Sequence, residues 1–275
     1  MKNKTPSVRT FTSLGAGAEH DPETNPTQAA AYWLRRDVVR GVLAPGQRLK
    51  VEQLVEFYGV GHSPIREAIL RLSGGGLVEH EHQKGYRVAG VSLADYDDVL
   101  DVYLRIYELA LTMAMERGDE AWEERLVVQL HRSAKVEKVL PDGDPEGREL
   151  WQRAYGDLHA AILSGCGSPV LLSLYRDLAG RLERYVNLFG DLTSDRDRDH
   201  RRDHKQLVEV ILTRDPKRVL PVVRRYFAGA QPIRESIKKA LRAPQNARSA
   251  SAKPEAKAPA KPSKPAGRSK AAPAK

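Results

Sequence analysis

The stretch YGVGHSPIREAIL, residues 58–70, places a glycine turn, a Ser-Pro pair and an amphipathic segment directly one after another. Ser63 is a residue type that caps helix N-termini, and Pro64 suits a first helical position because its missing N–H needs no partner there. Four apolar residues follow at helical spacing and predict one buried face: Ile65, Ala68, Ile69 and Leu72. The opposite face of this predicted helix carries Ser63, Arg66, Glu67 and Leu70. The stretch therefore predicts a turn followed by a helix with a largely polar outer face.

The residues on either side complete an order of elements. A first helix is predicted from Thr27, as its N-cap, to the breakers at residues 41–46, and VEQLVEFY, residues 51–58, is predicted as a second helix. SGGG, residues 73–76, ends the third helix, and LVEHE and YRVAG then alternate as two strands around HQKG. The order helix, helix, turn, helix, hairpin is that of a winged helix-turn-helix. The third helix of such a module can enter a DNA major groove.

Three segments of this block carry a specific resemblance: RGVLAPGQRL, LVEFYGVGHSPIREAILRLSGGGLVEH and QKGYRV. Together they resemble the N-terminal domain of the GntR family of bacterial transcription regulators. The resemblance implies a homodimer that binds a short inverted repeat in double-stranded DNA. It assigns the DNA contacts to five residues: His62, Ser63, Arg66, Lys84 and Gly85. His62 stands where the family usually has a base-reading Arg, and Glu52 stands where it often has a basic residue, so an atypical operator is expected.

Residues 92–241 are predicted to be entirely helical. Ser92 caps a long first segment, Asp144-Pro145 and Ser168-Pro169 start later helices, and Asp215-Pro216 starts a sixth that reaches Leu241 with a kink at Pro221. Short connections between such helices favour an antiparallel arrangement. The predicted fold is therefore mainly α: an N-terminal winged helix-turn-helix followed by an antiparallel bundle of about six helices.

Two segments of the helical block, LHAAILSGCGSPVL and DHKQLVEVILTRDPKRVL, resemble the ligand-binding domain of the FadR subfamily of GntR regulators, called FCD. In many members of that subfamily, inward Asp and His residues hold a divalent metal that helps to bind a small carboxylate. His159 and His204 match two of those histidines. The other matching positions hold tyrosines: Tyr155 for an Asp, Tyr226 for the last His, and Tyr103 and Tyr107 for an Arg and a Glu.

The substituted positions change the expected chemistry. Two imidazoles and neutral phenols lack the carboxylate that divalent sites normally include, and phenols ionise only near pH ~10. We therefore expect no metal and no other cofactor, and the His200 and His204 pair is more typical of a solvated helix start than of a metal site. Two interpretations of the tyrosines remain: large core residues that replaced a lost site, or the lining of a pocket for a more aromatic effector. The second assigns effector contacts to Tyr103, Tyr107, Tyr155, His159, His204 and Tyr226.

The net charge of +9 is unevenly distributed. Residues 242–275 contain nine Lys/Arg and one acid, so they carry +8, and they lack Val, Ile, Leu, Met and aromatic residues. We expect a disordered arm at 1–26, a DNA-binding domain at 27–91, a helical effector-binding and dimerisation domain at 92–241, and a disordered basic tail at 242–275. The tail is either a solubilising extension or a mobile electrostatic tether to DNA.

Several classes of protein are excluded by composition. No apolar run approaches the ~20 residues of a membrane span, and the first 26 residues lack the apolar stretch of a signal peptide. Cys166 is the only cysteine, which suits a reducing cytosol, and it is predicted as a small loop residue rather than a nucleophile. No G-x-S-x-G elbow or phosphate-binding loop occurs, so no catalytic residue is assigned.

The sequence thus predicts a cytoplasmic, homodimeric, sequence-specific DNA-binding regulator, most simply a repressor, modulated by a small-molecule effector. One alternative is a regulator with a degenerate pocket that is controlled by its abundance or by a protein partner. Another is a metal-dependent enzyme fused to a DNA-binding module. A cavity lined by the Tyr/His set favours the sensor, a filled core favours the degenerate regulator, and a metal with an open coordination position favours the enzyme.

Overall fold

The computed structural model describes residues 25–137, 145–190 and 198–243 of the 275-residue chain. The predicted arm and nearly all of the predicted basic tail lie outside the described residues. Over the described ranges the chain forms ten helices and three strands, in this order: α1 Pro26–Val39, β1 Arg48–Leu49, α2 Val51–Tyr58, α3 His62–Gly74, β2 Val78–Glu81, β3 Gly85–Val88, α4 Leu93–Arg117, α5 Glu120–Glu137, α6 Pro145–Ser164, α7 Pro169–Phe189, α8 His200–Ile211, α9 Pro216–Ala228 and α10 Gln231–Arg242.

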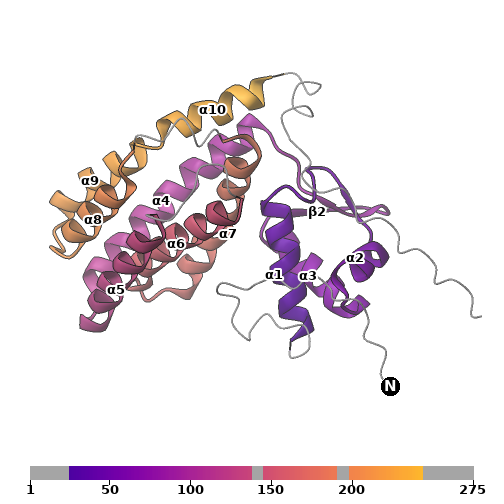
Figure 1. Cartoon of the computed structure of the whole chain (residues 1–275), viewed down its shortest axis with the longest axis horizontal. Coiled ribbons are helices and arrows are strands. Elements are labelled where there is room, and N and C mark those ends of the chain that lie inside the picture. Colours follow the sequence, from indigo (N-terminus) through magenta and orange to yellow (C-terminus); the bar gives the residue numbers. More distant parts are fainter. Residues whose placement is uncertain (1–24, 138–144, 191–197, 244–275) are drawn as a thin grey trace, which may run out of the picture.

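The winged helix-turn-helix and the hairpin are confirmed. Strands β2 and β3 pair antiparallel, with Glu81 opposite Gly85, and β1 adds to the free edge of β3, with Leu49 opposite Tyr86. The short strand β1 was not expected from the sequence, because two residues are too few to show an alternating pattern. Figure 1 shows α1, α2, α3 and the hairpin gathered on one side of the molecule and the helical bundle on the other.

Two predicted helix starts are wrong by one or two residues. The N-cap of α1 is Asn25, whose side chain accepts a hydrogen bond from the Gln28 backbone N–H at 3.0 Å, rather than Thr27. The N-cap of α3 is Gly61 rather than Ser63, because the Ile65 N–H already bonds to the Gly61 carbonyl. With its capping role removed, the Ser63 hydroxyl donates to the Glu67 carboxylate at 3.2 Å. The buried stripe of α3, from Ile65 to Leu72, is confirmed.

A buried polar contact fixes α1 to α2 inside the winged helix. Asp37 is 3% exposed, and its carboxylate accepts a hydrogen bond from the Tyr58 hydroxyl at 2.9 Å and pairs with Arg36 at 3.1 Å. The rings of Trp33 and Tyr58 stack beside it at 6.0 Å. Burial and the neighbouring carboxylate raise the pKa of Tyr58, so the phenol remains a hydrogen-bond donor. A buried carboxylate is tolerated here because its oxygens have partners.

The described part of the bundle contains seven helices, α4 to α10, and not the six predicted. Ser92 and Ser168 cap α4 and α7 as expected, each accepting a backbone N–H three residues ahead. The predicted sixth helix is wrong, because it divides at Gly229 and Ala230 into α9 and α10. Pro232 at the start of α10 suits a first helical turn, so the Gly and Pro together explain the division. Pro221 lies inside α9.

The bundle buries one large apolar core and one smaller cluster. The large core joins α4 to α9 and includes Trp122, Leu126 and the fully buried Cys166. The smaller cluster connects α4, α7 and α10 through Tyr96, Tyr185 and Ile237, and α10 extends along one edge of the bundle in Figure 1. Among the described helices, none has the length and the apolar character needed to cross a membrane.

Candidate functional site

The outer face of α3 carries the residues predicted to contact DNA. His62, Ser63 and Arg66 are all exposed, on the side of α3 opposite its buried stripe. Arg66 makes no hydrogen bond or ion pair within the described part of the chain, whereas Glu67 accepts the Ser63 hydroxyl. A guanidinium that projects from the first turns of a helix, without an acidic neighbour holding it, can reach a base edge or a phosphate.

The hairpin presents the second predicted contact. Lys84 and Gly85 lie at its tip and are exposed. Gly85 has φ +83°, and Gln83 before it has φ +62°, so the backbone turns tightly through the left-handed region. Any side chain at Gly85 would be strained in that conformation. The tip is therefore a narrow projection that carries one positive charge.

Four of the six predicted effector residues form one buried hydrogen-bonded chain, here called the Tyr–His cluster: Tyr107, His159, Tyr226 and His204. Tyr107 Oη lies 2.8 Å from His159 Nδ1, and Tyr226 Oη lies 3.0 Å from His159 Nε2 and 2.8 Å from His204 Nε2. These residues come from α4, α6, α8 and α9. Each is at most 6% exposed, so the cluster is closed to solvent.

The hydrogen-bond chain has a consistent neutral arrangement. Tyr107 donates to His159 Nδ1, His159 Nε2–H donates to Tyr226 Oη, and Tyr226 donates to His204 Nε2, a tautomer pattern inferred from the geometry. Burial lowers the pKa of His159 well below its ordinary value, and the charges of His204 and Arg198 act in the same direction. Burial also raises the pKa of Tyr107 and Tyr226. The cluster therefore holds a neutral His159 imidazole and neutral phenols.

A divalent metal does not fit this arrangement. Nε2 of His159 and Nε2 of His204 both point at Tyr226 Oη, so the phenol oxygen occupies the position between the two nitrogens that a shared ion would need. A neutral phenol with a raised pKa is a poor metal ligand. Among the described residues, no group of three or more His, Cys, Asp or Glu side chains could hold a metal ion.

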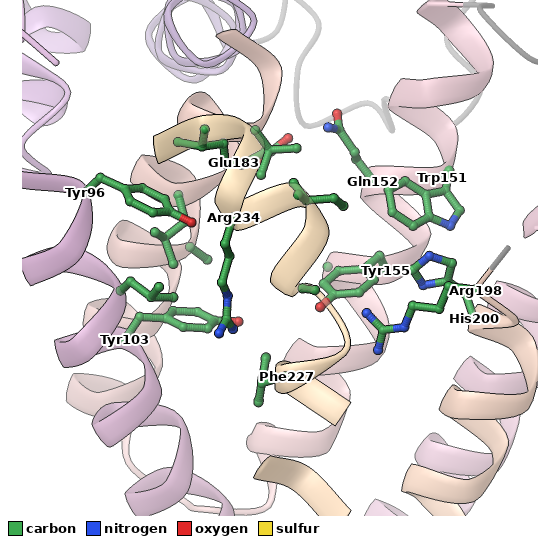
Figure 2. Close-up of a pocket in the computed structure, with 18 of the residues that line it drawn as sticks. Tyr96, Tyr103, Trp151, Gln152, Tyr155, Glu183, Arg198, His200, Phe227 and Arg234 are labelled. Atoms are coloured by element: carbon green, nitrogen blue, oxygen red, sulfur yellow. The ribbon is translucent and has the colours of Figure 1, made fainter. Parts of the chain in front are cut away.

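The other two predicted effector residues, Tyr103 and Tyr155, line a cavity of about 210 Å³ beside the Tyr–His cluster. Helices α4, α6, α7 and α10 form most of its wall, together with residues at the start of α8 (Figure 2). The lining is mostly apolar and aromatic, and Trp151 and Phe227 belong to it. Tyr155 is shared between the two regions, because its ring also lies 4.5 Å from the ring of His159.

Several residues that line the cavity were not predicted from the sequence. Arg234, from α10, and Arg198, from the segment before α8, project toward the cavity in Figure 2, and neither was predicted as a site residue. Nothing local distinguishes Arg234 from the other basic residues of an amphipathic helix. The sequence signal that could have identified Arg234 is the break between α9 and α10. That break changes which residues of α10 face the bundle.

Two helices that line the cavity also hold the DNA-binding domain. Gln152 Nε2 donates to Asn187 Oδ1 at 2.7 Å, and Asn187 Nδ2 donates to the Val39 carbonyl at the end of α1 at 3.2 Å. Gln152 lines the cavity, and so does Glu183, which lies near Arg35 of α1. A hydrogen-bonded path of two side chains therefore joins the cavity wall to the first helix of the DNA-binding domain.

Further contacts between the two domains surround that path. Arg40, the C-cap residue of α1, pairs with Glu149 of α6, and Arg153 Nη2 donates to Tyr32 Oη at 3.1 Å. Arg35 Nη2 donates to the Arg176 carbonyl at 3.5 Å. A methyl group at Gly180 of α7 would overlap the Arg35 guanidinium, so a side chain there would displace Arg35 from its present position. A movement of α6 or α7 at the cavity would consequently change contacts to α1.

Comparisons with known proteins agree with both parts of this structure. Residues 26–88 match the model of the bacterial regulatory proteins of the gntR family, and residues 98–229 match the FCD domain. The HTH-type transcriptional repressor GlaR of Escherichia coli (strain K12) is 31% identical over 205 residues, which cover 73% of this chain and 92% of the relative. A second relative is BphR of Paraburkholderia xenovorans (strain LB400), which is named as an uncharacterized HTH-type transcriptional regulator. It is 30% identical over 200 residues, which cover 73% of this chain and 81% of the relative.

Solved structures show the same fold. The E. coli protein McbR/YncC aligns with a TM-score of 0.61 at 17% identity, over 78% of this chain and 97% of the other. A putative transcriptional regulator GntR from Rhodococcus sp. RHA1 aligns with a TM-score of 0.52 at 19% identity, over 78% and 95%. The family models and the relatives carry the assignment, and the structures support the arrangement of domains. The chain belongs to the GntR family of bacterial regulatory proteins, with an FCD domain after its winged helix, and is a DNA-binding transcriptional regulator.

Proposed function

We propose that this regulator is a cytoplasmic homodimeric repressor that binds a short inverted repeat and is controlled by a small molecule in the bundle cavity. The observation that carries the DNA-binding part is the exposed outer face of α3, where Arg66 lacks an intramolecular partner in the described chain. His62 and Ser63 lie beside it, and Lys84 and Gly85 form the wing tip. In this proposal the helix reads bases in the major groove and the wing contacts the backbone or the minor groove.

The homodimer follows from the limits of one reading helix. A single short helix contacts too few bases to select one site among many, and two copies related by twofold symmetry bind two half-sites. The bundle has apolar side chains available for such a contact. Val102 and Leu109 are exposed seven residues apart on α4, and Val170 and Leu174 are exposed four apart on α7. The assignment as a repressor rests on the similarity to GlaR, which is named as one.

Effector control is supported by the shared wall between the cavity and the DNA-binding domain. A ligand changes DNA affinity only if it binds the DNA-competent and DNA-incompetent conformations differently. A ligand that shifts Gln152 or Glu183 alters the contacts to Val39 and Arg35 of α1, so it meets that condition. The proposed role is regulatory and not catalytic.

The closed Tyr–His cluster favours a second candidate in one respect. A core whose polar groups are paired with one another is what a regulator without an effector would retain. The open cavity beside the cluster argues for the sensor, because a degenerate regulator has no reason to keep a space of about 210 Å³ next to its interdomain contacts.

Genome-wide mapping of DNA bound by the full-length chain tests the proposed function. The expected result is a small set of sites that share an inverted repeat, each half-site centred about one helical turn from the other. The regulated genes beside those sites then indicate the effector. Binding spread evenly over the genome, with no shared motif, would reject a sequence-specific role, and a motif without twofold symmetry would reject the dimer.

A further inference from the structure

The cavity beside the Tyr–His cluster has a chemistry that narrows its ligand, and the inference from it rests on the proposed function as an effector-controlled regulator. Figure 2 shows aromatic rings on opposite sides of the space, from Tyr96 and Tyr103 of α4 to Trp151 and Tyr155 of α6, with Phe227 of α9 below. Leu100, Leu182, Val186 and Ile233 contribute the aliphatic lining. A ligand in this space therefore loses most of its water to apolar surface.

The size of the cavity limits the ligand to about one ring. An apolar cavity of about 150 Å³ in a protein interior is large enough to bind benzene. The space of about 210 Å³ here leaves room for one ring and a small substituent, and not for a fused polycyclic system or an extended chain. Rings prefer offset-stacked or edge-to-face contact with aromatic side chains, and both are available from walls formed by tyrosine, tryptophan and phenylalanine.

Arg234 places a positive charge at the cavity. Its side chain extends from α10 into the space between Tyr96, Tyr103 and Tyr155 (Figure 2), and it has no hydrogen bond or ion pair within the described ranges of the chain. Burial raises the pKa of Tyr96 to about 12, and the positive charge of Arg234 opposes that rise. A partly buried guanidinium beside aromatic rings is stabilised by an anion that shares the site.

Two other charged residues, Arg198 and Glu183, also line the cavity. Arg198 pairs with Asp203 at 2.7 Å and donates to the Tyr226 carbonyl at 2.8 Å. Burial raises the pKa of Glu183 and so favours its neutral carboxyl, while the positive charges of Arg35 and Arg40 oppose the rise. Among the described residues of the cavity wall, Arg234 is the cation whose side chain has no hydrogen bond or ion pair. An anion fits this cavity, and a cationic amine does not.

We propose that the cavity binds a monocyclic aromatic carboxylate, with the carboxylate paired to Arg234 and the ring held against Tyr155, Trp151 and Phe227. The planar fork of an arginine matches the two oxygens of a carboxylate, and a neutral amide of the same shape lacks the charge. The ligand is anchored by this one guanidinium instead of by a metal. The ring also lies against Trp151, whose neighbour Gln152 begins the path to α1.

Isothermal titration calorimetry of the full-length protein tests the assignment with benzoate, 4-hydroxybenzoate and phenylacetate as probes. Benzamide is the neutral isostere, benzylamine the cationic analogue and acetate the carboxylate without a ring. We expect at least one aromatic acid to bind at least tenfold more tightly than benzamide, benzylamine and acetate. Equal affinity for benzamide would overturn the ion pair, equal affinity for acetate would overturn the ring, and preference for benzylamine would overturn the sign of the charge.

Arg234→Gln is the decisive variant, and Lys239→Gln is its matched control because it removes one positive charge from an exposed position on the same helix. The aromatic acid should lose at least tenfold in affinity with Arg234→Gln and none with Lys239→Gln, and Arg234→Lys should recover part of the loss. An unchanged thermal midpoint shows that each variant is folded. Unchanged binding of the acid by a folded Arg234→Gln would overturn the proposal.

DNA binding by the same preparations separates this inference from the proposed function. Failure of every aromatic acid to bind at millimolar concentration, with specific DNA binding intact, overturns the ligand class alone. If the wild-type protein binds no DNA site specifically, the proposed function itself is overturned. Release of DNA by the acid with the wild-type chain, but not with Arg234→Gln, supports both.

Discussion

The Tyr–His cluster and the cavity next to it lie in the same bundle and share α6, yet they treat polar groups in opposite ways. His159 uses both ring nitrogens, one for Tyr107 and one for Tyr226, and no solvent reaches it. Arg234, on the other side of Tyr155, has no such partner within the described chain and points into open space. Where the protein supplies all partners of a buried polar residue, the residue stabilises the fold. Where the protein leaves a polar residue without a partner, a ligand can supply that partner.

The same contrast extends to the surface. Asp37 in the DNA-binding domain is buried and paired, whereas Arg66 on the outer face of α3 is exposed and unpaired among the described residues. Changes at paired residues should reduce stability with little effect on binding. Changes at unpaired ones should reduce binding with little effect on stability.

The largest effect is expected in the closed cluster. His159→Ala removes a fully buried ring and leaves the hydroxyls of Tyr107 and Tyr226 without their shared acceptor and donor, so unfolding should become easier by about 3 kcal/mol. Urea denaturation followed by circular dichroism measures the change. Specific DNA binding of the folded fraction should be nearly unchanged.

Two further variants show whether that loss comes from the cluster. Tyr226→Phe keeps the ring and removes only the hydroxyl between the two histidines, so it should cost about 1–3 kcal/mol. His131→Ala, at an exposed position of α5, is the control and should change stability by less than about 0.5 kcal/mol. Equal effects of His131→Ala and His159→Ala would contradict the structural role of the cluster.

The next effect is on DNA affinity. Arg66→Ala should weaken binding to the operator by about 1–3 kcal/mol, because a guanidinium contact to a base edge or phosphate is lost. The thermal midpoint should not change, since Arg66 is exposed and makes no side-chain hydrogen bond or ion pair in the described part of the chain. Fluorescence anisotropy with a labelled operator measures the affinity. Arg105→Ala, an exposed residue of α4 paired with Asp101, is the control, and equal affinities of the Arg66 variant and the parent would reject the contact.

A smaller effect is expected from the basic tail. Truncation after Ala243 preserves α10 and removes residues 244–275, which carry most of the positive charge of the C-terminal segment. Non-specific DNA affinity should fall, and the dependence of log K on log salt should become less steep, because fewer counterions are released. Titrations of non-specific DNA at several salt concentrations measure the slope. A tail that only aids solubility would leave the slope unchanged.

No effect at all is expected from removal of metal. Dialysis against a chelator should leave the unfolding midpoint and DNA binding as they were, because Tyr226 Oη occupies the position between His159 and His204. A metal that binds only the folded state would add RT ln(1 + [L]/Kd) to stability and would be lost on dialysis. Elemental analysis gives the direct answer: near-stoichiometric zinc or nickel, abolished by replacement of both histidines, would contradict the closed cluster.

The DNA-binding domain could be predicted almost completely from the sequence. The glycines, the Ser-Pro pair and the stripe from Ile65 to Leu72 act within a few residues of one another, and local preferences decide such features. The errors were of one or two residues at the caps, where Asn25 and Gly61 replaced Thr27 and Ser63. The caps at Ser92 and Ser168 were predicted correctly for the same reason.

The bundle was predicted less completely. The substituted positions were identified as a group, but the sequence could not show that Tyr107, His159, His204 and Tyr226 close on one another while Tyr103 and Tyr155 border a cavity. The division between α9 and α10 was missed, although Gly229 and Pro232 mark it, because both residues also occur at bends within one helix. That division determines where Arg234 lies.

By itself the sequence determined the order of elements, the family resemblance and the outward position of Arg66, because turns, caps and helical periodicity are properties of neighbouring residues. Only the tertiary structure decided which polar side chains have hydrogen-bond partners within the protein. His159 and Tyr226 are 67 residues apart and meet through the packing of α6 against α9, and Asn187 reaches Val39 across 148 residues. Whether a buried polar group finds its partner depends on such distant contacts. The same contacts separate a closed core from a cavity in which the Arg234 side chain has no partner among the described residues.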